Sequence, residues 1–439
     1  MKITNFEQTG LCEIEGILSI ENTENIEVSE LREILKCANV SFVLEGINRL
    51  QSTLICELKA SYVQQSQRYV TLKENSFDLP DLRHEDELKA KELLRKAFEL
   101  YEEMSRLKEG QFKGRPKAEN YLYGIPIEDA RYILPLACKT NISMAMNGEK
   151  LIDFFYLLND RHYSEIFSDL KKLVLSKLPE KLSLFLSKLK SNYNRKLIEN
   201  FYKSAFDKIS ECDNIVLLNS FEDLDLKVGL GAITSTHDKT PSEVMELWGD
   251  NATEKAKGVS ERVLGYGHES IAEQARTTFG MMCSMVTYHQ QIRHRLSENH
   301  REALFNIIQD EKREVVVPST VKESEFYNRF VELTHEFKKF RKYVLKEYGE
   351  EKSLNFLLNC DRIKLVISTN ARIDCQMLAD RICFNAQWEI RELSTKKLEK
   401  LRKLSQVLYV KALPSCVFGK CKEGKFTCGK QMIMKNKFA

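Results

Sequence analysis

The feature that most constrains the fold of this chain is an order of segments that occurs twice. A polar patch, a long amphipathic helix and an asparagine-centred segment follow one another in the first half and again in the second. The two asparagines are Asn147 and Asn370. Internal repetition of this kind predicts two copies of one structural unit. The chain has 439 residues, which suits two domains, and we place them at residues 1–210 and 211–439.

The elements expected in each copy are mainly helical. Apolar residues recur at helical spacing among many charges in His84–Gly110 and Lys322–Glu351, which predicts two long amphipathic helices. In a Lys-rich stretch, residues 181–213, lysines alternate with leucines, so we expect a solvated helix face there. Short strands are predicted at Asn39–Gly46, Asn214–Phe221 and Arg313–Pro318. Many helices with few strands favour an α+β fold with a modest sheet.

Composition narrows the classes of partner. The net charge is +3 although 30% of the residues are charged, so the balance is too even for bulk binding of nucleic acid. An anion site must therefore be local. No stretch approaches the roughly 20 apolar residues of a membrane span. The acidic start lacks the basic and apolar regions of a signal peptide. We expect a cytoplasmic protein with neither a membrane nor a nucleic acid as partner.

The cysteines are expected to be reduced thiols, because a cytoplasmic chain does not build a disulfide framework. Three of the 12 lie in the tail, residues 413–439, at Cys416, Cys421 and Cys428. Zinc sites prefer four ligands and a paired spacing such as CxxC, and the tail offers three thiols with no histidine nearby. A fourth ligand would have to come from elsewhere. We therefore predict a loosely structured tail and no metal site.

A polar stretch, Gln290–His300, carries the triplet Arg293, His294 and Arg295. Residues two apart on a helix point about 200° apart, so the two arginines would address different partners. Arginine offers a rigid fork of donors that suits phosphate and carboxylate groups. Taken alone, the triplet fits a solvated basic turn as well as an anion site.

The neighbourhood of the triplet favours the anion site. Upstream, Ser270 lies two residues after His268, in a stretch whose plainer interpretation is a helix N-terminus capped by Ser270 or Glu269. Downstream, Asn370 and Arg381 are eleven residues apart, which is close to three helical turns. Both side chains are therefore expected to face the same way.

The first half offers polar groups of a complementary kind. Ser66 and Arg68 supply a hydroxyl and a guanidinium that could share a phosphate. Arg131 stands just before an apolar run, where an arginine is a plausible anion ligand. A salt bridge from Arg131 to Glu128 or Asp129 is the equally good alternative.

Together these segments resemble the flavin-dependent thymidylate synthases. The signature of that family contains H-x-S-x-x-E, the triplet RHR, S-x-R-Y, E-x-A-R-x-x-L-P, N-x-R, an arginine eleven residues after that asparagine, and AQWEIR. The second half matches with "HESIAE", "QQIRHR", "NAR", Arg381 and "AQWEIR", in order. The first half matches with "ASYVQQSQRYV" and "IEDARYILPLACKT". The resemblance covers most of both halves and implies a tandem duplication, with a small, mostly antiparallel sheet and long helices in each copy.

Each half departs from the signature where the other keeps it. Cys56, Glu57 and Leu58 stand in the first half where the triplet is expected, and Leu158 replaces the arginine that follows the asparagine. In the second half S-x-R-Y is replaced by "EALF", and the spacer after the triplet is one residue short. The resemblance therefore implies composite sites in a homodimer that imitates the family's tetramer. The first type of domain would hold the nucleotide phosphate and the second the flavin.

The resemblance also assigns roles by matched position. The residues implied for FAD are Ser270, Arg293, His294, Arg295, Asn370, Arg372 and Gln376. Those implied for the nucleotide are Gln64, Ser66, Gln67, Arg68, Arg131, Gln290, Arg293 and Arg381. Arg381 would be the catalytic residue, because a fixed cation beside the pyrimidine favours its ionised form. Gln64 stands where the family has a glutamate, and Gln376 where it has asparagine or histidine.

The activity implied is the reductive methylation of dUMP to dTMP. Methylene-tetrahydrofolate would supply the carbon, FAD the hydride, and NADPH would reduce the flavin. One alternative is a related flavin enzyme that modifies a different pyrimidine nucleotide. Another is a degenerate homologue that binds a nucleotide without catalysis.

Overall fold

The computed structural model describes residues 1–20, 26–73, 76–190 and 194–438. By the contacts of its described residues the chain forms two compact units, each described by itself below. Unit 1 comprises residues 1–198, 284–289 and 303–362, and unit 2 comprises residues 199–283, 290–302 and 363–439. These units are defined by contacts, so the predicted sequential boundary near residue 210 stays a prediction about the duplication.

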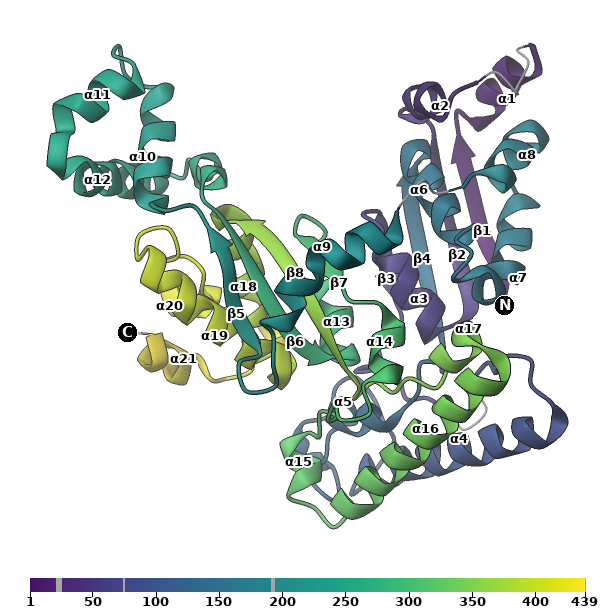
Figure 1. The fold of residues 1–439 in the computed structure, drawn as a ribbon. Coiled ribbons are helices and arrows are strands. Elements are labelled where there is room, and N and C mark those ends of the chain that lie inside the picture. The colour runs from purple at the N-terminus through teal and green to yellow at the C-terminus, as the bar shows by residue number, and fades with distance from the viewer. Residues whose placement is uncertain (21–25, 74–75, 191–193, 439) are drawn as a thin grey trace. The chain divides into compact units, whose positions relative to one another are not determined.

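Unit 1 contains a four-stranded sheet in the order β1-β2-β4-β3, in which neighbouring strands are antiparallel (Figure 1). The strands are β1 (Lys2–Thr9), β2 (Asn39–Asn48), β3 (Ser61–Gln64) and β4 (Lys139–Asn147). Along β2, Val40, Phe42 and Leu44 are buried, because alternate side chains of a strand point to the same face. The accompanying helices are α1 (Leu11–Ile20), α2 (Val28–Leu35), α3 (Arg49–Cys56), α5 (Ile127–Ala130), α6 (Gly148–Leu158), α7 (Ser164–Leu175) and α8 (Glu180–Lys188).

The second sheet has the order β5-β6-β8-β7, with its strands at Ile215–Ser220, Arg276–Ser284, Arg362–Asn370 and Glu298–Arg301, respectively. This order is that of the first sheet, strand for strand, as a duplicated chain requires. The helices that continue this half are α10 (Leu224–Thr234), α11 (Pro241–Trp248), α12 (Ala252–Gly265), α13 (Met285–Gln291), α14 (Leu304–Gln309), α18 (Ala371–Arg381), α19 (Trp388–Leu404), α20 (Ser415–Phe418) and α21 (Gln431–Phe438). The predicted α+β fold with modest sheets is thus confirmed.

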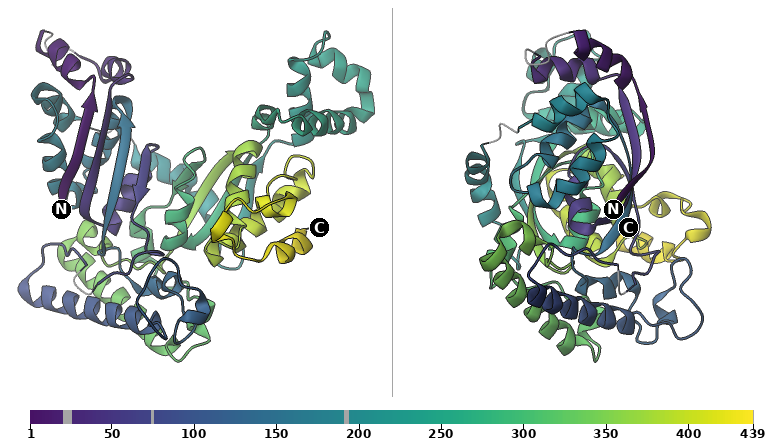
Figure 2. Two further views of the ribbon diagram at one scale, coloured as in Figure 1. Left: turned by 180° about the vertical axis from the view of Figure 1, so that it is seen from behind. Right: turned by 90° about the vertical axis from the view of Figure 1, so that its right-hand side faces the viewer.

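The two long helices are α4 (His84–Met104) and α16 (Tyr327–Tyr348), and they pack against each other within unit 1 (Figure 2). Lys96 Nζ lies 2.7 Å from Glu336 Oε2 across this contact. Both helices are shorter than predicted. Gly349, with φ of 91°, ends α16, because a left-handed residue after the last turn is a position that glycine takes without strain. The flanking residues form the separate short helices α15 (Ser319–Lys322) and α17 (Glu350–Leu354).

Three local predictions were wrong or incomplete. Residues 313–318 form no strand. The Val316 N–H donates a hydrogen bond to the Cys360 carbonyl, and Arg313 forms an ion pair with Asp310. These individual contacts, rather than a strand ladder, hold the segment as a linker. The tail is not loosely structured, because α20 and α21 form within it. The Lys-rich stretch forms α8 and α9 (Arg195–Asp207), while its residues 191–193 lie outside the described residues.

Among the helices the structure describes, none is long and apolar enough to cross a membrane.

Candidate functional site

The junction of β8 and α18 positions four of the predicted site residues. Asn370 is the N-cap of α18, and its side-chain oxygen accepts a hydrogen bond from the Ile373 N–H at 3.0 Å. Such a cap satisfies one of the donors that a helix start leaves open. Arg372 and Gln376 follow in the first turns, and Arg381 ends the helix. One strand-to-helix turn therefore sets the direction of all these side chains.

Arg381 lies against the arginine-histidine triplet, which is distant from it in sequence. Its Nε donates to His294 Nε2 at 2.6 Å, and its terminal nitrogen donates to the Gln290 carbonyl at 3.1 Å. His294 follows α13 in a turn closed by a bond from its own N–H to the Gln291 carbonyl. The sequence interpretation gave Arg381 and His294 separate roles, whereas the structure joins them directly.

The charge state of His294 follows from this contact. Burial, and after it the positive charges of Arg381, Lys397 and Arg293, together lower the pKa of His294 from its ordinary 6.5 to about 3. The imidazole is therefore neutral at physiological pH. A neutral ring can accept the Arg381 hydrogen bond, so the guanidinium keeps its charge and gains a fixed orientation.

The segment that carries Ser270 packs against α18. It forms a short 3-10 helix, η5 (Glu269–Gln274), whose N-cap position is His268, so the alternative in which Ser270 or Glu269 caps a helix is wrong. Arg372 pairs with Glu273 at 2.6 Å, and the Ala371 N–H donates to the Ala275 carbonyl. Ser270 and Gln376 are exposed, so both are accessible to a ligand.

A buried ion pair beneath α18 escaped the sequence interpretation. Asp374 of α18 and Lys397 of α19 are 2.7 Å apart, and their side chains are 0% and 1% exposed. Thr369 accepts a second hydrogen bond from the ammonium group. A signal for this pair was present, because Lys397 continues the apolar positions Ile390 and Leu401 at helical spacing. A lysine in that stripe has to be buried with a partner.

The polar groups of the first half gather around Glu128 in unit 1. Arg68 Nε and an Arg115 terminal nitrogen lie 2.7 and 2.8 Å from its carboxylate. Burial disfavours the charged form, yet the two arginines hold the pKa of Glu128 below its usual value. Arg131, which is buried, donates from Nε to the Glu128 main-chain carbonyl, and Asp129 accepts from Thr320. The structure thus brings Arg68 and Arg131 to one segment.

Gln67 is the most informative residue of this cluster. Its side chain is 5% exposed, and neither carboxamide atom has a hydrogen-bond partner among the described residues. A buried polar group without a partner costs about 1–3 kcal/mol, so it needs a reason to be retained. Neighbouring Ser66 accepts from the Arg68 N–H at 3.2 Å, which orients the loop. A ligand with donors and acceptors would satisfy Gln67.

Gln64 differs from its neighbours, because its carboxamide is already engaged. It donates to Ser52 Oγ at 2.6 Å, and its oxygen lies 2.9 Å from Nε2 of the buried His289. Nδ1 of the same histidine lies 3.0 Å from Thr53 Oγ1. A nucleotide contact by Gln64 would have to replace one of these bonds.

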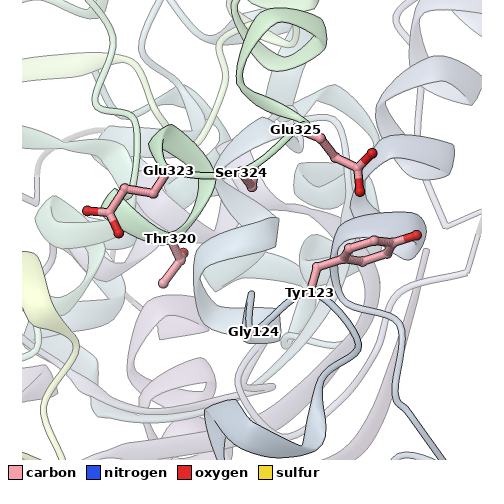
Figure 3. Close-up of a pocket in the computed structure, with 6 residues that line it drawn as sticks. All are labelled: Tyr123, Gly124, Thr320, Glu323, Ser324 and Glu325. Carbon is pink, nitrogen blue, oxygen red and sulfur yellow. The ribbon is translucent and has the colours of Figure 1, made fainter.

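A surface cavity of unit 1 adjoins this region (Figure 3). The residues that line it are Tyr123, Gly124, Thr320, Glu323, Ser324 and Glu325. This lining contains two carboxylates and no lysine, arginine or histidine among the described residues, so it does not suit a phosphate. The arginines around Glu128 therefore suit an anion better than the lining of this cavity does.

Comparison with known proteins identifies the family. The family model described as "Thymidylate synthase complementing protein" matches residues 25–179 and 217–405, well over half of the chain. The chain belongs to this family. The match in two regions agrees with the repeated strand order of the two sheets, so the chain is a duplicated member of the thymidylate synthase complementing proteins.

Curated relatives of this family support the same arrangement. A flavin-dependent thymidylate synthase of Pyrococcus furiosus is 31% identical over 203 residues, which cover 42% of this chain and 83% of the relative. A namesake from Thermococcus kodakarensis is 37% identical, over 37% of this chain and 71% of the relative. A third relative of the same name, from Clostridium tetani, is 28% identical over 45% of this chain and 86% of its own length. Each match covers most of the relative but less than half of this chain, as expected for two copies.

Proposed function

We propose that this protein is a flavin-dependent thymidylate synthase, a methyltransferase that converts dUMP to dTMP with methylene-tetrahydrofolate and NADPH. The observation that carries the proposal is the Arg381–His294 hydrogen bond of 2.6 Å in a chain of this family. It holds a charged guanidinium in a fixed direction beside Arg293 and Arg295. Preorganised charge of this kind stabilises a developing anion without reorganisation during the reaction.

The residues proposed for FAD fit the chemistry of that group. Arg293, Arg295 and Arg372 provide cations. The neutral His294, whose Nε2 accepts from Arg381, provides an Nδ1–H donor. Ser270, Asn370 and Gln376 complete the set. When bound, FAD would supply hydride transfer. The chain itself would bind and orient the flavin and keep the Arg381 charge in place.

The nucleotide phosphate is proposed to bind at the Arg68 cluster. The Glu128 carboxylate occupies Arg68 and Arg115, so a phosphate would replace one anion by another at the same guanidinium groups. Gln67 would gain the hydrogen bonds that it lacks within the described residues. Ser66 and Arg131 would add contacts here, and Gln290, Arg293 and Arg381 would reach the rest of the nucleotide.

We infer that the active sites are composite, with the nucleotide set of one chain and the flavin set of another in a homodimer. Mixing two inactive variants, Arg68→Ala and Arg295→Ala, tests this. In a mixed dimer one of the two sites combines both intact sets, so random mixing would restore about one quarter of the wild-type activity. No recovery after subunit exchange would mean that each chain builds its own site.

A second candidate is a related flavin enzyme acting on a different pyrimidine nucleotide. The residue that favours it is Gln64, which stands at a position where the family signature has a glutamate. Its carboxamide is hydrogen-bonded to Ser52 and His289. Release of the hydrogen at uracil carbon 5 from labelled dUMP, with folate and NADPH, distinguishes the two. Hydrogen release supports thymidylate synthesis, and its absence from a flavin-loaded protein favours the second candidate.

The visible spectrum of the purified protein is the first experiment. We expect the absorption bands of a bound oxidised flavin, either as isolated or after incubation with FAD. A colourless protein that does not take up FAD would contradict both candidates and leave a non-catalytic homologue.

A further inference from the structure

Four cysteines of unit 2 lie in the region where the C-terminal tail contacts the loop after α18. Cys383 follows that helix, Cys416 lies in α20, and Cys421 and Cys428 lie in the loop before α21. Burial raises the pKa of Cys383 and of Cys416, and neighbouring thiols add to this: Cys428 and Cys416 for Cys383, and Cys421 and Cys428 for Cys416. The structure thus adds to the three tail thiols a fourth from a distant part of the sequence.

Hydrogen bonds hold the backbone around this cluster. The Asn385 side chain donates to the Phe426 carbonyl at 3.0 Å, which ties the Cys383 loop to the residues just before Cys428. The Asn385 N–H points at Cys383 Sγ, with 3.5 Å between nitrogen and sulfur. A backbone donor two residues after a cysteine stabilises a thiolate, and outer-shell bonds of this type orient the ligands of metal sites. Gly429, with φ of 71°, forms the tight turn directly after Cys428.

The tail lacks an apolar core that would explain its fold. Phe418, Phe426, Met432 and Ile433 are all more than half exposed. Of the residues after 415, only Cys416 and Met434 are buried in the described part of the chain. A segment of this size that buries so little apolar surface needs a covalent or metal cross-link to hold one conformation.

We propose that Cys383, Cys416, Cys421 and Cys428 bind one structural zinc ion. Zinc in structural sites takes four tetrahedral ligands, and an all-cysteine set is one of the common ones. The ion would join the tail to the end of α18, the helix that carries Arg381. The site is distinct from the proposed active site, and its metal content can be measured whatever reaction the protein catalyses.

The charges around the cluster suit such an ion. Four thiolates and one divalent cation leave two negative charges, and the tail places Lys420, Lys422, Lys425 and Lys430 among the cysteines. The Lys430 ammonium lies 5.1 Å from the centre of the Phe384 ring, next to Cys383. Within the described residues no three candidate ligands already surround one point at coordination distance, so binding requires the thiols to turn inward. The exposed loops allow that adjustment.

The test uses the full chain, purified without a metal-affinity tag. Elemental analysis is expected to find about one zinc per chain. After removal of the metal, titration with Co²⁺ should produce the intense charge-transfer and ligand-field bands of tetrahedral cobalt bound to thiolates. Stoichiometric iron in place of zinc would overturn the zinc assignment, and a chain that binds neither Zn²⁺ nor Co²⁺ would overturn the site.

Single variants then test the ligand set. Cys383→Ser and Cys428→Ser are each expected to weaken zinc binding at least tenfold, measured by competition with a chromophoric chelator, and to lower the cobalt charge-transfer intensity. Cys212→Ser is the matched control, because Cys212 is an exposed cysteine of the same unit that is remote from the cluster in sequence, and it should bind zinc as the wild type does. Unchanged binding by Cys383→Ser would remove the fourth ligand and contradict the proposal. The cobalt spectrum of the unmodified chain remains decisive if a variant does not fold.

Discussion

The two strand-to-helix junctions of this chain, β4–α6 and β8–α18, share one construction and differ in chemistry. In each, a strand ends at an asparagine whose side chain caps the following helix, Asn147 for Lys150 and Asn370 for Ile373, both at 3.0 Å. In the second copy the helix ends at Arg381, bound to His294, whereas in the first it ends at the buried Leu158. Both copies keep the capping asparagine, because the helix start needs it. Only the second copy keeps a positive charge at the helix end, at Arg381.

The interior face of the two helices shows the same divergence. Four residues after the capping asparagine, α6 has Leu151 and α18 has Asp374, both completely buried. The leucine needs only apolar neighbours, while the aspartate requires Lys397. An ion pair in the interior adds little stability over a pair of apolar residues, so its presence only in the copy with Arg381 points to a positioning role.

The largest effect is expected on activity, and it tests whether the first copy binds the nucleotide and the second binds the flavin. Arg68→Ala and Arg295→Ala should each lower kcat/KM on the order of a thousandfold, because each removes a charge proposed to contact a phosphate or the flavin. Arg106→Ala and Arg262→Ala, at exposed arginines outside both clusters, are the controls and should retain wild-type rates. Full activity in either test variant would refute the assignment of separate roles to the two halves.

The next largest effect concerns the buried ion pair. Lys397→Met should destabilise the protein by about 3–5 kcal/mol in urea denaturation, because Asp374 would stay buried without its partner. The double variant Asp374→Leu with Lys397→Met imitates the first copy and should recover most of that stability. If the pair positions α18, the double variant remains impaired in kcat. Lys400→Met, on the more exposed face of α19, should change stability by less than about 0.5 kcal/mol.

A smaller effect separates capping from ligand binding. Asn147→Ala and Asn370→Ala should each cost about 1 kcal/mol of unfolding free energy, because each removes an N-cap. Only Asn370→Ala should also weaken FAD binding. Asn370→Asp preserves the cap but adds a negative charge, so it should keep the stability and still bind FAD less well. Equal FAD affinity in all three variants would leave Asn370 with a purely structural role.

The last effect is the pH dependence that arises from His294. Its pKa in the folded protein, about 3, is below the ordinary value of 6.5, so the unfolded chain binds the proton more readily. Stability from this group is therefore complete above pH 6.5 and falls as the pH is lowered toward 3. His294→Gln should show a smaller loss of stability between pH 7 and pH 4.5 than the wild type. An identical loss in both proteins would mean that His294 is not held neutral by burial.

Much of the fold followed from local patterns. The strands near Asn39 and Asn214, the two long helices and the repeated order of segments are confirmed, because hydrophobic period is a property of neighbouring residues. The strand predicted at Arg313–Pro318 was wrong, since its valines resemble a strand but lie in a linker. A ladder requires a neighbouring strand, and no local pattern reports whether one is present.

For the candidate site, too, the sequence predicted some features and only the structure showed others. The residue types and their spacing were readable in the chain, and they led to the family to which it belongs. The contacts could not be read from the sequence. The hydrogen bonds between Arg381 and His294 and between Gln64 and His289 join residues far apart in the chain. The burial of Gln67 without a hydrogen-bond partner among the described residues likewise depends on the folded surroundings. The same holds for Cys383, which no spacing connects to the tail.

The sequence by itself determined that the chain is a duplication, which chemical groups each copy retains, and roughly where the long helices and two of the strands lie, because propensity, period and motif are local. Only the tertiary structure decided which charges are buried and which partners they meet. Burial sets the protonation of His294 and the need of Asp374 for Lys397. These are properties of the surroundings of a side chain, and the surroundings exist only after the chain has folded.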